Sequence, residues 1–107
     1  MKQAIYISGA ISGIPNYRDI FERAEQKIKE HFKTFDVVSP TKLGLNDGDD
    51  YEYCMKVCLE ALRKCHYMII IDDYDGNWKK SEGVKREIAE AGKNSIKIIH
   101  LSVLGAI

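Results

Sequence analysis

Short apolar runs alternate with helix-periodic segments along this chain, and this alternation constrains the fold more than any other feature. Runs rich in Ile, Val and aromatic residues predict buried strands at 4–7, 35–38, 68–71 and 95–101. Apolar residues at helical spacing predict helices at 17–32, 51–64 and 81–91. Strands and helices in this order form βαβ units with right-handed crossovers. We therefore expect a single α/β domain over residues 1–107, a small Rossmann-like or flavodoxin-like three-layer αβα sandwich whose parallel sheet has four or five strands.

Local signals mark the ends of two of these helices. Asn16 is a plausible N-cap of the first helix, and Asp19 follows three residues later in a capping-box-like position. Gly92 is expected to stop the third helix.

The balance of charge limits the partners that this chain can have. Its 107 residues contain 16 Lys and Arg and 16 Asp and Glu, so the formal net charge is zero. Such a chain has no electrostatic footprint for a nucleic acid polymer or an anionic membrane. Its apolar runs are too short to span a bilayer, and its first residues lack a signal-peptide stretch. Cys54, Cys58 and Cys65 indicate reduced thiols, and we expect a cytoplasmic protein.

Ligands of open parallel sheets bind beyond the carboxyl ends of the strands. In this sequence those ends lead into loops at 8–13, 40–50 and 72–83. The first loop contains Gly9 and Gly13, which allow close approach of the backbone, and the hydroxyls of Ser8 and Ser12. It matches neither the P-loop nor the G-x-G-x-x-G pattern. A ligand-binding loop and a flexible turn are equally good interpretations of these residues.

The third loop contains Ser81 and Gly83 at the start of the third predicted helix. Exposed amides and the positive end of the helix dipole favour an anion such as a phosphate at this place. Ser81 is therefore a helix N-cap, a phosphate ligand, or both.

Glu87 lies one turn inside the same helix, about 65–70° from the centre of its apolar face. A carboxylate at the border of the apolar face of a helix, near the edge of the sheet where ligands bind, can act as a nucleophile or a general base. The alternative is a partly exposed Glu paired with a Lys.

Cysteines and aromatic residues give weaker signals. Cys54 and Cys58 are spaced by four residues, but a zinc site needs four convergent ligands, so small buried thiols are expected and no metal. No pattern calls for a cofactor. Aromatic residues such as Tyr51 and Trp78 can stack on a base, and without a basic groove they favour one small ligand over a nucleic acid strand.

Taken together, the segments 5–13, 55–62 and 78–87 resemble the nucleoside 2-deoxyribosyltransferase-like superfamily, and small bacterial and phage members most of all. The most specific match is the arrangement Trp78-x-x-Ser81-x-Gly83-x-x-x-Glu87. The resemblance implies cleavage or transfer at the N-glycosidic bond of a nucleoside or nucleotide. It implies that Glu87 is the nucleophile and that Tyr6 lies beside it. Ser81 stands where the similar 2′-deoxynucleoside 5′-monophosphate N-hydrolases keep a phosphate-binding serine, which favours a 5′-monophosphate.

The substrate-binding residues that the loops and the resemblance suggest are Ser8, Gly9, Ile11, Ser12, Gly13, Cys58, Asp73, Asp75, Trp78, Ser81 and Gly83. The amides of the first loop and Ser81 would hold the phosphate, and Asp73 or Asp75 would assist departure of the base, with no feature choosing between those two. Homo-oligomerisation is implied by the resemblance, and the apolar residues at 103–107 could pack on a neighbouring copy.

One residue departs from the family pattern. Members usually have an Asp in the second helix, where this chain has Cys58. This departure keeps a rival interpretation open, a nucleotide-binding or sensing module with weakened catalysis. A second rival is an interaction domain without a ligand, which thermal shifts against a nucleotide panel would separate.

Overall fold

Four parallel strands form the middle layer of the molecule in a computed structural model that describes residues 2–73 and 77–105. The sheet order is β2-β1-β3-β4, with β1 (Ala4–Ser8), β2 (Asp36–Val38), β3 (Tyr67–Ile70) and β4 (Lys97–His100). Ser8 pairs with Ile70, so β1 and β3 end level with each other. The predicted α/β fold with a parallel sheet is confirmed, and the sheet has four strands.

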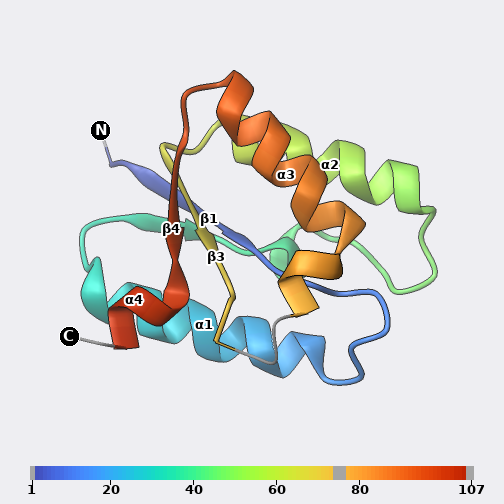
Figure 1. Ribbon diagram of the computed structural model, residues 1–107, viewed down its shortest axis with the longest axis horizontal. Coiled ribbons are helices and arrows are strands. Elements are labelled where there is room, and N and C mark those ends of the chain that lie inside the picture. Colours follow the sequence, from blue (N-terminus) through green and yellow to red (C-terminus); the bar gives the residue numbers. More distant parts are fainter. Residues whose placement is uncertain (1, 74–76, 106–107) are drawn as a thin grey trace.

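Helices cover both faces of this sheet, and Figure 1 shows them as two separate layers. The helices are α1 (Tyr17–His31), α2 (Tyr51–Arg63), α3 (Glu82–Lys93) and α4 (Leu101–Gly105), with short 3-10 turns η1 (Pro40–Lys42) and η2 (Asn77–Lys80). Helices α1 and α4 lie on one face, and α2 and α3 lie on the other.

Alternation along β1 divides the hydrophobic core between the two faces. Ile5 and Ile7 pack with α1 residues such as Phe21 and Ile28. Tyr6 points to the opposite face and packs with residues of α2 and α3, including Leu62 and Val84. Every second residue of β1 is therefore delivered to the α2–α3 side, and this includes Ser8, which is fully buried.

The end of the fourth strand differs from the prediction. The apolar run predicted a strand to residue 101, whereas β4 ends at His100 and Leu101 begins the short helix α4. Asp72 explains the change, because its carboxylate accepts hydrogen bonds from the Ser102 amide at 2.7 Å and the Ser102 hydroxyl at 2.8 Å.

The apolar residues of α4 are partly buried. Leu101 and Leu104 lie in the core beside α1. Leu104 thus packs inside its own chain, Val103 is exposed, and residues 106–107 lie outside the described part.

Of the two helix-end predictions, one holds in position and the other is wrong. Asn16 is the N-cap residue of α1 as predicted, but its side chain makes no capping hydrogen bond. Helix α3 continues through Gly92 to Lys93, and Asn94 ends it, since the Asn94 side-chain amide donates to the Glu90 carbonyl at 2.8 Å.

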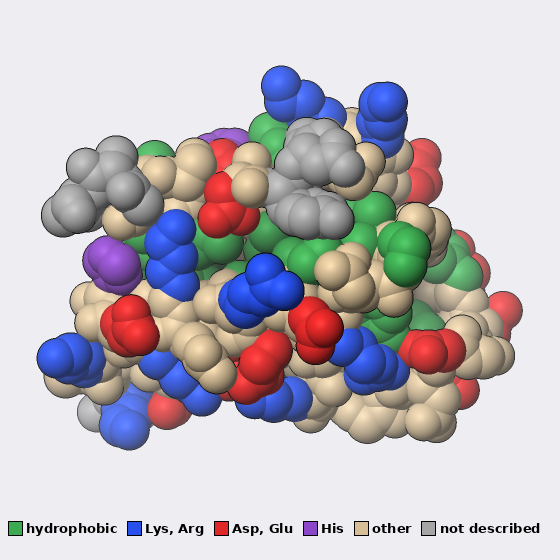
Figure 2. Space-filling model, turned by 90° about the horizontal axis from the view of Figure 1, so that it is seen from below, with side chains coloured by type: hydrophobic (Ala, Val, Ile, Leu, Met, Phe, Trp, Pro, Cys, Tyr) green, Lys and Arg blue, Asp and Glu red, His purple; other side chains and the backbone are tan. Residues whose placement is uncertain are grey.

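Charges of both signs are interspersed on the face seen in Figure 2, which looks at the molecule from the α1 side. This distribution agrees with the formal net charge of zero. Among the helices of residues 2–73 and 77–105, none has the length and apolar character needed to cross a membrane.

Candidate active site

Glu87 is a buried carboxylate held by two hydroxyl groups from β1. Only 5% of Glu87 is exposed, and Tyr6 and Ser8 are both fully buried. The Ser8 hydroxyl donates to Glu87 Oε1 at 2.7 Å, and the Tyr6 hydroxyl donates to Oε2. Both carboxylate oxygens are therefore engaged, and their orientation is set by a strand of the sheet.

Burial and hydrogen bonding act on the charge of this carboxyl in opposite directions. Desolvation raises the pKa of Glu87 to about 7, although the hydrogen bonds from Tyr6 and Ser8 favour the ionised form. Burial, followed by the nearby Glu87 charge, raises the pKa of Tyr6 well above its ordinary value, so Tyr6 keeps its proton and acts as the donor. The carboxyl is thus poised between its two charge states near neutral pH.

A cavity of about 610 Å³ opens at the carboxyl ends of the strands, and Glu87 is among the residues that line it. This volume lies within the range of small-molecule sites, roughly 300–1,000 Å³. The predicted site residues that line the cavity are Gly9, Ile11, Ser12, Gly13, Cys58, Ser81, Gly83 and Glu87. These residues come from the first loop, α2 and the start of α3, so the structure brings three separate segments together.

The first loop needs its glycines for two different reasons. A Cβ atom on Gly9 would lie 3.0 Å from both Ile71 Cδ1 and Phe21 Cζ, so Gly9 lets the chain pass close to the core. Gly13 has a φ of +79°, a conformation that favours glycine. The first of these constraints comes from packing, and neither by itself indicates a ligand.

Ser81 caps α3 as predicted. Its hydroxyl accepts a hydrogen bond from the Val84 amide at 3.2 Å, and the residue also lines the cavity. The hydroxyl hydrogen remains available to donate toward the cavity.

Two of the three cysteines are buried, as the sequence predicted. Cys58 and Cys65 are buried and Cys54 is half-buried, and all three are free. Burial raises the pKa of Cys58 to about 11, so this residue presents a neutral thiol beside Tyr6. Within residues 2–73 and 77–105, no group of three or more His, Cys, Asp or Glu side chains could hold a metal ion.

Among the described residues predicted to bind substrate, Ser8, Asp73 and Trp78 are not among those that line the cavity, and Ser8 instead donates its hydroxyl to Glu87. Asp73 forms an ion pair with Lys27 at 3.6 Å, and Trp78 packs edge-to-face on His100 with ring centroids 5.1 Å apart. Asp75 lies outside the described residues.

The sequence placed the loop at 40–50 at the ligand-binding edge of the sheet but named no binding residue in it or in the first turn of α1, and these two segments form one wall of the cavity. Its residues include Tyr17, Arg18, Pro40, Thr41 and Asp47. The sequence feature that could have pointed to these residues is the length of the loop. It is the longest irregular stretch, with two Gly and three Asp residues between 41 and 50.

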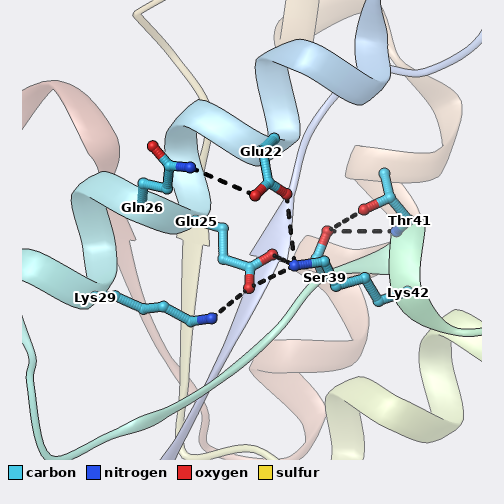
Figure 3. Close-up of polar contacts among 7 residues, drawn as sticks. All are labelled: Glu22, Glu25, Gln26, Lys29, Ser39, Thr41 and Lys42. Atoms are coloured by element: carbon cyan, nitrogen blue, oxygen red, sulfur yellow. Dashed lines mark hydrogen bonds and ion pairs between the residues drawn. The ribbon is translucent and has the colours of Figure 1, made fainter.

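A charged cluster holds η1 in this wall (Figure 3). The Glu25 side chain is 4% exposed, and its carboxylate lies 2.9 Å from Lys42 Nζ and 2.6 Å from Lys29 Nζ. Burial raises the pKa of Glu25, but the two lysines outweigh it and the net pKa lies below its ordinary value. Because Lys42 follows Pro40 and Thr41 directly, this ion pair ties the cavity wall to α1.

Comparison with solved structures defines the fold class of the molecule. The chain superposes, with a TM-score of 0.61 and 18% sequence identity, on a 2-deoxyribosyltransferase from the psychrotolerant bacterium Bacillus psychrosaccharolyticus, described as a biocatalyst for the synthesis of nucleosides. The match covers 91% of this chain and 70% of that chain. The four-stranded parallel sheet with its helices is thus the nucleoside deoxyribosyltransferase fold.

The family follows from the sequence comparison. Residues 3–100 match the model of a family described as "Domain of unknown function (DUF4406)", and the chain belongs to this family. No match to a curated protein was found.

Proposed function

We propose that this protein cleaves or transfers the N-glycosidic bond of a (deoxy)nucleoside 5′-monophosphate or nucleoside, with Glu87 as the nucleophile. One observation carries the proposal. A buried carboxylate, fixed by hydroxyls of Tyr6 and Ser8, lines a cavity whose volume suits a nucleoside. The shared fold with a 2-deoxyribosyltransferase supports it.

In the first step, an ionised oxygen of Glu87 attacks the anomeric carbon of the sugar. The bond from this carbon to the base nitrogen breaks through an oxocarbenium-like transition state, and its electron pair leaves with the base. The base takes a proton from solvent in this scheme, since Asp73 is paired with Lys27 away from the residues that line the cavity. The product is a glycosyl ester of Glu87.

In the second step, water or the nitrogen of a second base attacks the same carbon, gives up one proton to solvent and displaces the Glu87 carboxylate. Two inversions give net retention of configuration, and Glu87 is released as it began. Water gives hydrolysis and a base gives transfer. Tyr6 and Ser8 are the positioning residues, because their hydrogen bonds hold the attacking carboxylate and stabilise its charge.

Ser81 and the amides of residues 9–13 are the groups that we assign to a 5′-phosphate. Ser81 and Gly83 lie at the start of α3, a helix of 12 residues whose N-terminus favours an anion. All of these segments line the same cavity. A homo-oligomer and a cytoplasmic location stay predictions from the sequence.

The test is direct. Deoxy- and ribonucleosides and their 5′-monophosphates are incubated with the protein, and free base is measured by chromatography. We expect base release that falls by at least about a thousandfold in Glu87→Gln, the scale on which removal of a nucleophile acts. Glu82→Gln is the matched control, because Glu82 is exposed on the same helix. Equal base release by Glu87→Gln and the parent would refute the nucleophile assignment.

Cys58 favours a second candidate, a nucleotide-binding module with weakened turnover. A neutral, buried thiol beside Tyr6 stands where the resembling superfamily has a carboxylate. Tight nucleotide binding without base release, together with activity gained in Cys58→Asp, would support this candidate over the first.

A further inference from the structure

The charges around the cavity are unevenly distributed. Three carboxylate residues line it, namely Asp47, Asp49 and Glu87. Among the described lining residues, Arg18 is the one cation. Arg18 is therefore the one full positive charge that these lining residues offer to an anionic substrate, beside the amides and the helix N-terminus already assigned to the phosphate.

Arg18 already holds an anion together with its neighbour Tyr17. Arg18 Nη2 lies 2.9 Å from Asp47 Oδ1, and the Tyr17 hydroxyl donates to the same oxygen. Both donors come from the first turn of α1, whereas Asp47 belongs to the loop between η1 and α2. Two donors from one helix turn thus converge on one carboxylate oxygen at the wall of the cavity.

The carboxylate that occupies these donors is easily exchanged. The side chains of Asp47 and Arg18 are 74% and 49% exposed, and exposed ion pairs of this kind contribute little to stability. The Asp49 carboxylate makes a different contact, since it accepts a hydrogen bond from the Asn46 backbone amide at 2.8 Å. A phosphate monoester carries more charge than a carboxylate and pairs with guanidinium through two parallel hydrogen bonds.

We propose that Tyr17 and Arg18 form a binding site for the phosphate of a nucleoside 5′-monophosphate, and that the Asp47 carboxylate competes for it. The inference rests on the proposed function for the identity of the ligand. It adds two residues to the phosphate site at residues 9–13 and Ser81. The loop at 9–13 leads through residues 14–16 directly into Tyr17, so these donors lie next along the chain. A monophosphate must therefore displace the Asp47 carboxylate from Tyr17 and Arg18 when it binds, whereas a neutral nucleoside need not.

Binding tests this site separately from turnover. Calorimetry with Glu87→Gln protein compares each deoxynucleoside 5′-monophosphate with its nucleoside, since this variant is designed not to break the glycosidic bond. Adding Arg18→Gln is expected to weaken monophosphate binding about tenfold or more and nucleoside binding less than about twofold. Adding Asp47→Asn is expected to tighten monophosphate binding a few-fold, because the competing charge is gone.

A control variant and a second set of ligands accompany this binding experiment. Arg23→Gln removes an exposed arginine of the same helix that does not line the cavity, and it should change neither affinity. In case Glu87→Gln folds poorly, the comparison is repeated in the Glu87-containing protein with 2-deoxyribose 5-phosphate, 2-deoxyribose and inorganic phosphate, which have no glycosidic bond. An unchanged monophosphate affinity in Arg18→Gln, equal weakening of both ligands, weaker monophosphate binding in Asp47→Asn, or no phosphate binding overturns the proposal. Selective binding without base release would uphold this site and refute the enzymatic function.

Discussion

The Ser8 hydroxyl lies 2.7 Å from Glu87 Oε1 and joins the last residue of β1 to the second turn of α3, 79 positions later in the chain. Tyr6 reaches the other oxygen of the same carboxylate from two residues earlier on the same strand face. The pleat of one strand therefore supplies both donors. Since each donor favours the ionised form while burial opposes it, the charge of Glu87 depends on these two hydroxyls.

The pH dependence of catalysis follows from this balance. Attack on the sugar requires the carboxylate, and burial raises the pKa of Glu87 to about 7. We expect kcat/KM to rise about tenfold per pH unit in the acidic range and to level off above neutral pH. Initial rates of base release between pH 5 and pH 9 measure this profile. A rate that is already maximal at pH 5 would show that the pKa of Glu87 is not raised in the folded protein.

Removing one donor should move that profile. Tyr6→Phe deletes the stronger of the two hydrogen bonds that lower the pKa of Glu87, so the acidic limb should shift upward by about one pH unit. Comparison of the variant and the parent on one substrate cancels any titration of the substrate. A purely structural role of Tyr6 would lower the rate at every pH and leave the midpoint unchanged.

The same pKa predicts a pH-dependent stability. Because the pKa of Glu87 is raised from 4.5 to about 7, the folded state binds its proton more tightly than the unfolded state does. The free energy of unfolding should therefore fall as pH rises through this window, by about 2–3 kcal/mol between pH 5 and pH 8. Urea unfolding of the parent and Glu87→Gln at both pH values isolates this contribution, because all other groups are common to both. A parallel pH dependence of the two proteins would show that Glu87 titrates at its ordinary pKa.

The fold was predictable because its signals are local. Apolar runs such as 68–71 and the helical spacing of Phe21, Ala24 and Ile28 identify the strands and helices that the structure contains. The start of α4 was missed because a run of apolar residues continues through Leu101, and only the distant Asp72 ends the strand there.

The candidate site was predictable in part for the same reason. The position of Glu87 near the apolar face of its helix is a local property, and the structure buries it. The wall formed by Tyr17, Arg18 and Asp47 depends on a contact between segments about thirty residues apart, which no periodicity reveals.

Glu25 allows a test of stability at a buried carboxylate that does not line the cavity. Replacing it by Gln removes both ion pairs of a buried carboxylate, with Lys29 and Lys42, and should cost about 1–2 kcal/mol at neutral pH. Because the pKa of Glu25 is lowered in the folded state, this contribution is present at neutral pH and is lost as pH falls below 4. Urea unfolding at pH 7 and pH 3 measures both effects.

Glu22 provides the matched control for this change. It lies one turn earlier on α1, its side chain is 49% exposed, and it is 3.5 Å from the same Lys42 amine. Glu22→Gln should change the free energy of unfolding by less than about 0.5 kcal/mol. Equal costs for the two variants would mean that burial of Glu25 adds nothing to its ion pairs.

Gly9 tests how tightly the first loop is held against the core. A Cβ atom at this position would lie 3.0 Å from Ile71 Cδ1 and Phe21 Cζ, and these side chains are 5% and 1% exposed. Gly9→Ala should therefore cost about 1–3 kcal/mol in chemical denaturation, as overpacking of a core does. Gly48→Ala is the control, since its Cβ would meet no atom within 4 Å and its effect should stay within about 0.5 kcal/mol.

A double variant identifies the contact responsible. Ile71→Val removes the Cδ1 atom that the new methyl group would meet, at a cost of its own of about 1 kcal/mol. Combined with Gly9→Ala, it should destabilise the protein by less than the sum of the two single changes, because it removes one of the two 3.0 Å contacts of the new methyl group, the other being with Phe21 Cζ. Additive costs would show that Ile71 Cδ1 is not the limiting contact, either because Phe21 is or because the loop moves. Since Gly9 also lines the cavity, such a movement would then appear as weaker nucleotide binding in Gly9→Ala.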